Sequence, residues 1–389
     1  MQLKRILKNI DKPLLIISAI LFVFGLIMIF SASNITAFMK YSASPYRYFL
    51  KQSIFLIVSL IASLFLIQFY SKSYHIIATL AVYAIGVTLT LLLMYGSLKN
   101  KAISWIDLGF FSIQPSEFAK IIIIIWLSCY YDKHQEHLNK YGTVLYPILI
   151  SVVIAGLIFA QPDLGTTIIY SLIVATIFFM APISKEIRNK VLWIIMGGIV
   201  IMSLVLVGGG SSLLTERQKE RFDFSNPCST EKFYGKGNQV CNGYIAINNG
   251  KLLGVGLGNS TQKYLYLPEA HTDFIFAIIM EELGYLGCII ILFLYYLLIG
   301  RIIKIGRDSH NTRGFLICMG VAVYIILHIF VNLGGIFGIM PMTGVPLPFM
   351  SYGGSFTMCL VFALTFVQRI NVENCFYKEK NLKKLEKKK

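Results

Sequence analysis

The residues of this chain that are best suited to chemistry lie in one short segment, 268–273, which reads PEAHTD and runs straight into an apolar stretch. The segment combines two carboxylates, Glu269 and Asp273, with the imidazole of His271. Such groups are costly to place at the edge of a membrane helix, and where they occur they usually serve a function. A carboxylate in the position of Asp273 can act as a general base, and Glu269 and His271 could orient it or contact the substrate. The alternative is structural: Thr272 or Asp273 caps the following helix, and Glu269 and His271 are interfacial hydrogen-bonding residues.

The elements that must position these residues are membrane helices. Of the 389 residues, 56% are hydrophobic and only 14% are charged, and the mean hydropathy is +0.69. Apolar runs of roughly 20 residues follow one another, each long enough to cross a bilayer. Inside lipid the backbone must satisfy its own hydrogen bonds, and continuous rather than alternating runs favour helices over a barrel. We predict an all-α polytopic membrane protein with about ten transmembrane helices, at 12–32, 48–69, 74–96, 116–131, 143–160, 164–182, 189–208, 273–300, 314–338 and 353–371.

The net charge of +16 follows a pattern that indicates a membrane rather than nucleic acid. With the N-terminus in the cytoplasm, the inward-facing segments hold 22 of the 35 Lys and Arg residues. Cytoplasmic enrichment of these residues is the usual rule for membrane proteins. Both termini are therefore expected in the cytoplasm, with residues 372–389 as a basic cytoplasmic tail near anionic lipid. Nucleic acid is not an expected partner.

This topology places the loops 97–115, 209–272 and 339–352 outside, and only 209–272 is long. We expect residues 1–371 to form a single transmembrane domain that carries this long extracytoplasmic loop. Two of the seven cysteines, Cys228 and Cys241, fall in the loop, where oxidation is permitted. We expect them to form a disulfide, and two free thiols are the alternative.

Four segments make the chain resemble a known family, the SEDS proteins (shape, elongation, division and sporulation). They occur in the family's order across nearly the whole chain, and they read SWIDLGFFSIQPSEFAK (104–120), QPDLGTT (161–167), GLGNSTQKYLYLPEAHTDFIFAIIMEELG (256–284) and GIMPMTGVPLPFMSYGGS (338–355). The closest branch is the division branch, and the elongation branch is the runner-up. One departure is Ser104, where the family usually has Arg or Lys, and a second is Lys101, where a glycine is usual.

The resemblance implies a peptidoglycan glycosyltransferase in the bacterial cytoplasmic membrane. Such an enzyme polymerises lipid II, adding it to a growing undecaprenyl-linked glycan at the outer face of that membrane. The family's catalytic aspartate matches Asp273. The resemblance also implies a class B penicillin-binding transpeptidase as partner, because a polymer without crosslinks bears no load, together with other division proteins.

Sugar transfer from lipid II also requires positive charge at the leaving pyrophosphate. Lys263 and Arg217 are the candidate phosphate-binding residues, and Lys219 and Arg221 lie beside the latter. The alternative for each is an ordinary solvated loop charge. A divalent cation, Mg or Mn, is another way to hold the phosphates, and Glu269 and His271 could help to hold it, although the sequence shows no certain cofactor.

The remaining candidates lie in other segments. Glu117 and Lys120 share one helix face, and we expect an ion pair that stabilises a polar cavity, with pyrophosphate contact as the second interpretation. Trp105 either stacks on a sugar or belongs to the interfacial aromatic belt. Ser351 is a candidate wall residue in an irregular segment rich in Pro and Gly. Asp163 could line the cavity, and a turn or helix cap is the simpler interpretation.

Three function classes compete at this point. An enzyme needs its acid–base groups at one membrane face, where the candidates gather. A lipid II transporter also uses broken helices and intramembrane charges, but it places its site near the midplane. A scaffold for other division proteins would not need Asp273 at all. The sequence favours the enzyme.

Overall fold

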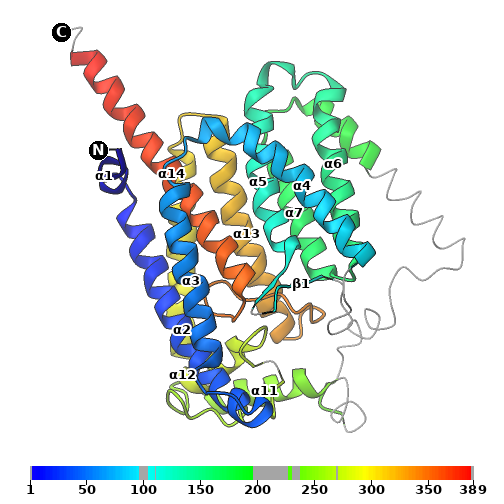
Figure 1. Ribbon diagram of the computed structural model, residues 1–389, viewed down its shortest axis with the longest axis vertical. Coiled ribbons are helices and arrows are strands. Elements are labelled where there is room, and N and C mark those ends of the chain that lie inside the picture. Colours follow the sequence, from blue (N-terminus) through cyan, green and yellow to red (C-terminus); the bar gives the residue numbers. More distant parts are fainter. Residues whose placement is uncertain are drawn as a thin grey trace, which may run out of the picture.

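The computed structural model describes residues 2–95, 104–109, 111–195, 227–229, 237–268 and 270–386. The molecule is an elongated bundle of helices, and both termini lie near one end of it (Figure 1). Seven of the described helices are long and apolar enough to cross a membrane, and Leu164–Met180 is a shorter apolar helix. The prediction of an all-α polytopic membrane protein is therefore confirmed.

The helices of the N-terminal half are α1 (Gln2–Lys8), α2 (Lys12–Tyr41), α3 (Arg47–Leu66), α4 (Tyr74–Tyr95), α5 (Pro115–Lys133), α6 (Tyr141–Ala160) and α7 (Leu164–Met180). Short 3₁₀ turns at Ser71–Ser73 and Gln135–His137 and a small antiparallel hairpin of β1 (Ile106–Asp107) and β2 (Ser112–Ile113) lie between them. The C-terminal half contains α11 (Asn238–Gly250), α12 (Ile275–Arg307), α13 (Thr312–Ile336) and α14 (Gly354–Glu386).

These helices coincide with nine of the ten predicted spans. The remaining span, 189–208, is helical as far as residue 195, and the rest of it lies outside the described residues. The last helix is longer than its predicted span, because α14 continues without a break from the membrane segment to Glu386.

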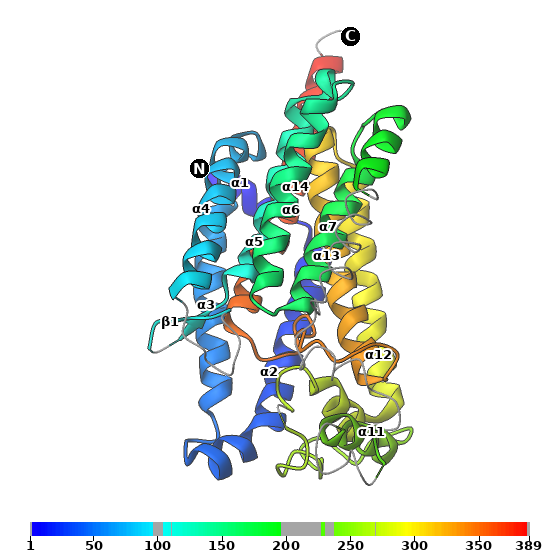
Figure 2. The same cartoon turned by 90° about the vertical axis from the view of Figure 1, so that its right-hand side faces the viewer.

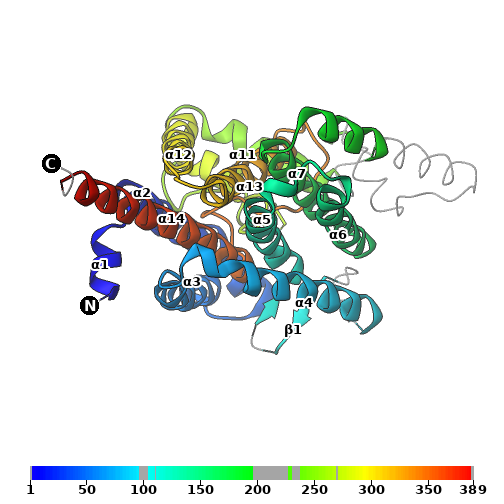
Figure 3. The same ribbon diagram turned by 90° about the horizontal axis from the view of Figure 1, so that it is seen from above.

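Two helices form the centre of the bundle, α5 and α13. Seen from above, the other helices surround them (Figure 3), and α5 packs against α4, α7, α13 and α14. The central position explains why α5 buries most of its residues, including the charged Glu117 and Lys120. By contrast, α3 exposes most of its apolar side chains, as expected for a helix that faces lipid.

The two ends of the bundle are formed by different segments of the chain. At one end the terminal helices meet, where Arg5 pairs with Glu379 over 2.6 Å. At the other end lie α11 and the chain that follows it, and the segment between α13 and α14, drawn in orange, crosses the bundle above α11 (Figure 2). The predicted catalytic segment belongs to this second end.

The apolar pattern predicts one continuous helix over 273–300, and this prediction is wrong at one position. α12 is broken at Gly284, where φ is 66° and ψ is −172°. A Cβ at this position would lie 2.4 Å from the amide nitrogen of Gly254, so only glycine fits the close approach of the two backbones. Residues 275–283 therefore form a separate short helix ahead of the membrane span.

Candidate functional site

Asp273 lies in the turn directly before α12, with its side chain half-buried. The hydroxyl of Thr272 donates to its Oδ1 over 3.1 Å. The N-cap position of α12 is occupied by Phe274, which has no polar side chain to cap with. Neither Thr272 nor Asp273 thus takes the N-cap position that the structural alternative required.

The irregular segment 341–353 forms one wall beside Asp273. Its Gly344 has a φ of +72°, and a Cβ added there would lie 3.9 Å from Oδ2 of Asp273. The side-chain amide of Asn332 on α13 donates to the carbonyl oxygen of Asp273 over 2.7 Å and to that of Val345 over 2.8 Å. The aspartate and the segment are therefore fixed to the same point on α13.

His271, two residues before Asp273, lies in a buried aromatic group that includes Tyr352 of the wall segment. Its ring centroid is 4.3 Å from that of Tyr48 and 5.7 Å from that of Tyr352, and its carbonyl oxygen accepts from the amide of Tyr352 over 2.9 Å. Burial, with a smaller contribution from the positive charge of Lys40, lowers the pKa of His271 to about 4. The imidazole is therefore neutral at pH 7 and is not a fixed cation for phosphate.

Lys263 does not face an open cavity. Its side chain is 2% exposed, and its Nζ lies 3.3 Å from Oε1 of the fully buried Glu282. Ser31 on α2 donates to both oxygens of this carboxylate, at 2.7 and 2.8 Å. The neighbouring Glu281 accepts from Ser260, from Thr261 and from Asn249 on α11. Both glutamates therefore hold the chain of residues 251–263 against the break in α12.

Glu117 and Lys120 form the ion pair that their spacing predicted, with 2.8 Å between Nζ and Oε1. The pair continues to a residue that the sequence analysis missed, His328 on α13, whose Nε2 is 3.0 Å from Nζ of Lys120. The ammonium can only donate, so Nε2 accepts and Nδ1 carries the proton. Nδ1 is directed to the carbonyl oxygen of Pro346, at 3.3 Å. A buried ionic chain thus ends on the segment beside Asp273.

The sequence carried a signal for this part of the site. His328 and Asn332 are polar residues four apart in an otherwise apolar span, and polar residues inside a membrane helix are functional candidates by default. That spacing places both side chains on one face of α13.

The other predicted residues have different surroundings. Trp105 is 37% exposed and precedes the hairpin, which packs on α14. Ser104, at the position where the family usually has a basic residue, is buried and donates to the carbonyl oxygen of Gln161 over 3.1 Å. Ser351 is buried, and its hydroxyl accepts from the amide of Leu347, so it fixes a turn in the wall segment.

Asp163 caps α7 by accepting from the amide of Thr166 over 3.1 Å, as the simpler interpretation expected. Its other oxygen accepts from the side chain of Gln114, which immediately precedes α5. Two predicted site residues, Glu269 and Arg217, lie outside the described residues, as do Lys219, Arg221 and Lys101.

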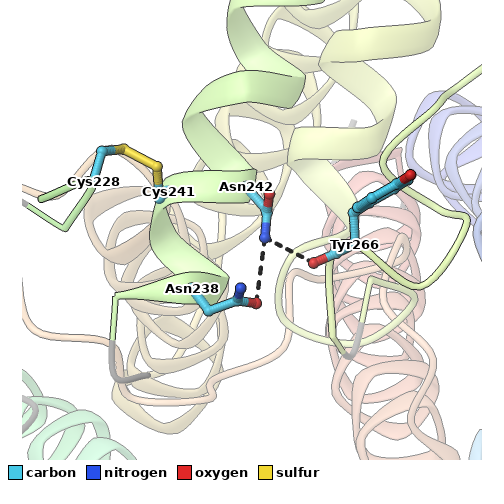
Figure 4. The surroundings of a disulfide bond; sticks show 5 residues. All are labelled: Cys228, Asn238, Cys241, Asn242 and Tyr266. Carbon is cyan, nitrogen blue, oxygen red and sulfur yellow. Dashed lines mark hydrogen bonds between the residues drawn. A yellow bond between two sulfur atoms is a disulfide. The ribbon is translucent and has the colours of Figure 1, made fainter. Parts of the chain in front are cut away.

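The expected disulfide between Cys228 and Cys241 is present (Figure 4). Cys241 is on α11, and this helix is tied to the chain that leads into the site. Asn242 donates to the carbonyl oxygen of Tyr266 over 2.8 Å, and Gln239 donates to that of Pro268 over 3.3 Å. The disulfide therefore holds the helix that supports the approach to Asp273.

The described residues contain no group of three or more His, Cys, Asp or Glu side chains that would suit a metal ion. A divalent cation therefore stays a prediction, because Glu269 is not described and phosphate oxygens of a substrate also serve as metal ligands.

The fold and this site define a polytopic membrane protein with a polar, carboxylate-bearing site at one end of its bundle. A family model described as "Cell cycle protein", covering FtsW, RodA and SpoVE, matches residues 12–375. A relative from Bacillus subtilis (strain 168), named "Probable peptidoglycan glycosyltransferase FtsW", is 35% identical over 385 residues, which span 95% of this chain and 92% of the relative. The chain belongs to the FtsW, RodA and SpoVE family of cell cycle proteins, as its motifs indicated.

Two solved structures share the fold. One is a chain of a structure described as "Structural coordination of polymerization and crosslinking by a peptidoglycan synthase complex", with a TM-score of 0.71 and 23% identity, covering 93% of this chain and 97% of that chain. The other is the rod shape determining protein RodA of Thermus thermophilus, with a TM-score of 0.65 and 22% identity, covering 93% of this chain and 96% of that chain.

Proposed function

We propose that this chain is a peptidoglycan glycosyltransferase that polymerises lipid II, with Asp273 as its general base. The observation that carries the proposal is the position of Asp273. Its half-buried carboxylate lies at the end of the bundle away from the two termini, and a Cβ at Gly344 of the irregular segment would lie 3.9 Å from its Oδ2. The family supports the reaction class, since the relative from Bacillus subtilis bears the name of this activity.

In the proposed reaction the 4-hydroxyl oxygen of one lipid-linked disaccharide attacks the anomeric carbon of the growing chain, with inversion. Asp273 takes the proton of that hydroxyl as the new glycosidic bond forms. The bond between the anomeric carbon and the pyrophosphate oxygen breaks, and undecaprenyl pyrophosphate leaves with the electron pair. A base of this kind contributes about 10² to 10⁴ in rate.

The charge on the leaving pyrophosphate needs a cationic partner. The ion pair with Glu282 occupies Lys263, so Lys263 can serve the phosphates only if it leaves that pair. Arg217 and a divalent Mg or Mn ion are the other two candidates. Loss of polymerisation on addition of EDTA would identify the metal, and unchanged polymerisation would favour a basic side chain.

The proposed orientation has both termini in the cytoplasm and Asp273 at the outer face. It is supported by the enrichment of Lys and Arg in the segments at the end of the bundle that carries the termini. It also places the disulfide outside the cytoplasm, in the compartment where disulfides persist.

We further propose a monofunctional class B penicillin-binding transpeptidase as the partner, within a division complex. The likeness to a chain of a peptidoglycan synthase complex supports a partner that crosslinks, and the FtsW name of the relative supports division over elongation.

A transporter of lipid II is the second candidate, because the buried chain of Glu117, Lys120 and His328 resembles the intramembrane charges of transporters. Polymerisation in detergent separates the two, since no bilayer is present to cross. We expect the purified protein, with its transpeptidase partner, to convert lipid II into long glycan strands. Lipid II movement in vesicles without polymer in either medium would overturn the enzyme assignment.

A further inference from the structure

We infer that Asn332 is a positioning residue that sets the distance between Asp273 and the wall segment 341–353. The inference rests on the proposed role of Asp273 as the base. It extends that role to a residue on another helix, which none of the family motifs used above contains.

The contacts of Asn332 fix the orientation of its side-chain amide. The side chain is 5% exposed, and its amide nitrogen lies 2.7 Å from the carbonyl oxygen of Asp273 and 2.8 Å from that of Val345. Both partners are acceptors, so the nitrogen must face them, and each of its two N–H groups is used. One planar group therefore spans the backbone of the base and the backbone of the wall.

The neighbouring turns of α13 support the same contact. One turn earlier, His328 faces the carbonyl oxygen of Pro346, the next carbonyl in the wall segment. Toward the end of the helix, a Cβ at Gly335 would lie 3.1 Å from the sulfur of Met342. The wall segment is thus laid along the last turns of α13, and Asn332 is the point where Asp273 joins it.

A positioning role has a chemical consequence. General-base catalysis requires the carboxylate oxygen within hydrogen-bond reach of the attacking hydroxyl, and a displacement of about 1 Å can cost about a hundredfold in rate. Loss of Asn332 releases Asp273 from the wall without removing any group that touches the substrate. The loss should therefore appear in kcat rather than in KM.

The test uses the purified full-length protein with its transpeptidase partner, polymerising lipid II in detergent. We expect Asn332→Ala to lower kcat by about tenfold to a hundredfold with KM changed less than twofold. Asn332→Asp should also be damaging, although it keeps the shape of the side chain, because an ionised carboxylate cannot donate and a protonated one can donate to only one of the two carbonyl oxygens.

The matched control is Asn374 on α14, which is also buried and also donates its side-chain amide to a backbone carbonyl, that of Ile305 over 3.2 Å. Asn374→Ala should lower thermal stability to a degree similar to Asn332→Ala while kcat stays near the wild-type value. If kcat falls equally in both variants, in step with stability, Asn332 is only structural and the inference fails. It also fails if Asn332→Asp is as active as wild type.

The activity of Asp273→Asn distinguishes the positioning role of Asn332 from the proposed role of Asp273 as the base. An inactive Asp273→Asn together with fully active Asn332 variants overturns the positioning role and leaves the base assignment intact. An active Asp273→Asn overturns the base assignment itself.

Discussion

Removing the Lys263 side chain should mainly lower the free energy of unfolding, and it should not act directly on the sugar-transfer step. Its ammonium lies 3.3 Å from a carboxylate oxygen of Glu282, and the two side chains are 2% and 0% exposed. Lys263→Ala therefore leaves a buried negative charge without its cation. The hydroxyl of Ser31 remains as a donor to the carboxylate but carries no charge. Breaking such a pair on one side commonly costs about 3–5 kcal/mol.

The double variant Lys263→Met with Glu282→Gln separates charge from packing. It fills a similar volume, leaves no unpaired charge and keeps an acceptor for Ser31, so most of the lost stability should return. The measurement is thermal unfolding in detergent, monitored as the loss of monodisperse protein. It compares wild type, Lys263→Ala, Lys263→Met, Glu282→Gln and the double variant. If Lys263→Ala kept wild-type stability but lost turnover, the lysine would act on the substrate phosphates and the ion-pair reasoning would be refuted.

Two further predictions follow from the surroundings of the site. Replacing both Cys228 and Cys241 by Ser should cost roughly 3 kcal/mol and reduce polymerisation more than membrane insertion, because the disulfide holds the helix that supports the approach to Asp273; mass spectrometry that finds both thiols alkylated in unreduced protein would contradict this. The pKa of His271 falls to about 4 in the fold, so the unfolded chain binds the proton more tightly, and the free energy of unfolding should decline as the pH drops from about 6.5 toward 4, by up to about 3 kcal/mol. His271→Phe keeps an aromatic ring beside Tyr48 and should remove this part of the pH dependence; an unchanged profile would show that His271 does not titrate in this way.

The spans were predictable because long apolar runs leave the backbone in lipid no structure other than helix. The pair of Glu117 and Lys120 was predictable from helical spacing alone. The break at Gly284 was not, because its cause is the close approach of Gly254, which the chain brings back only after folding.

The ion pair of Lys263 and Glu282 could not be assigned for the same reason. The two residues are nineteen apart and meet only because residues 251–263 fold back onto the break in α12. Asn332 and His328 are two polar residues four apart in an apolar span, but their role could not be assigned because most of their partners are backbone carbonyls in segments without regular structure. A sequence pattern shows which side chains are present, but these contacts depend on the directions of backbone carbonyl groups, which the pattern does not show.

The most direct test of the account is the polymerase activity of Asp273→Asn. The substitution keeps the shape of the side chain and removes its ability to take a proton. In detergent, with lipid II and the transpeptidase partner, we expect no glycan product from a variant that is folded, inserted in the membrane and still bound to its partner. Full-length glycan from this variant at the wild-type rate would show that Asp273 is not the base.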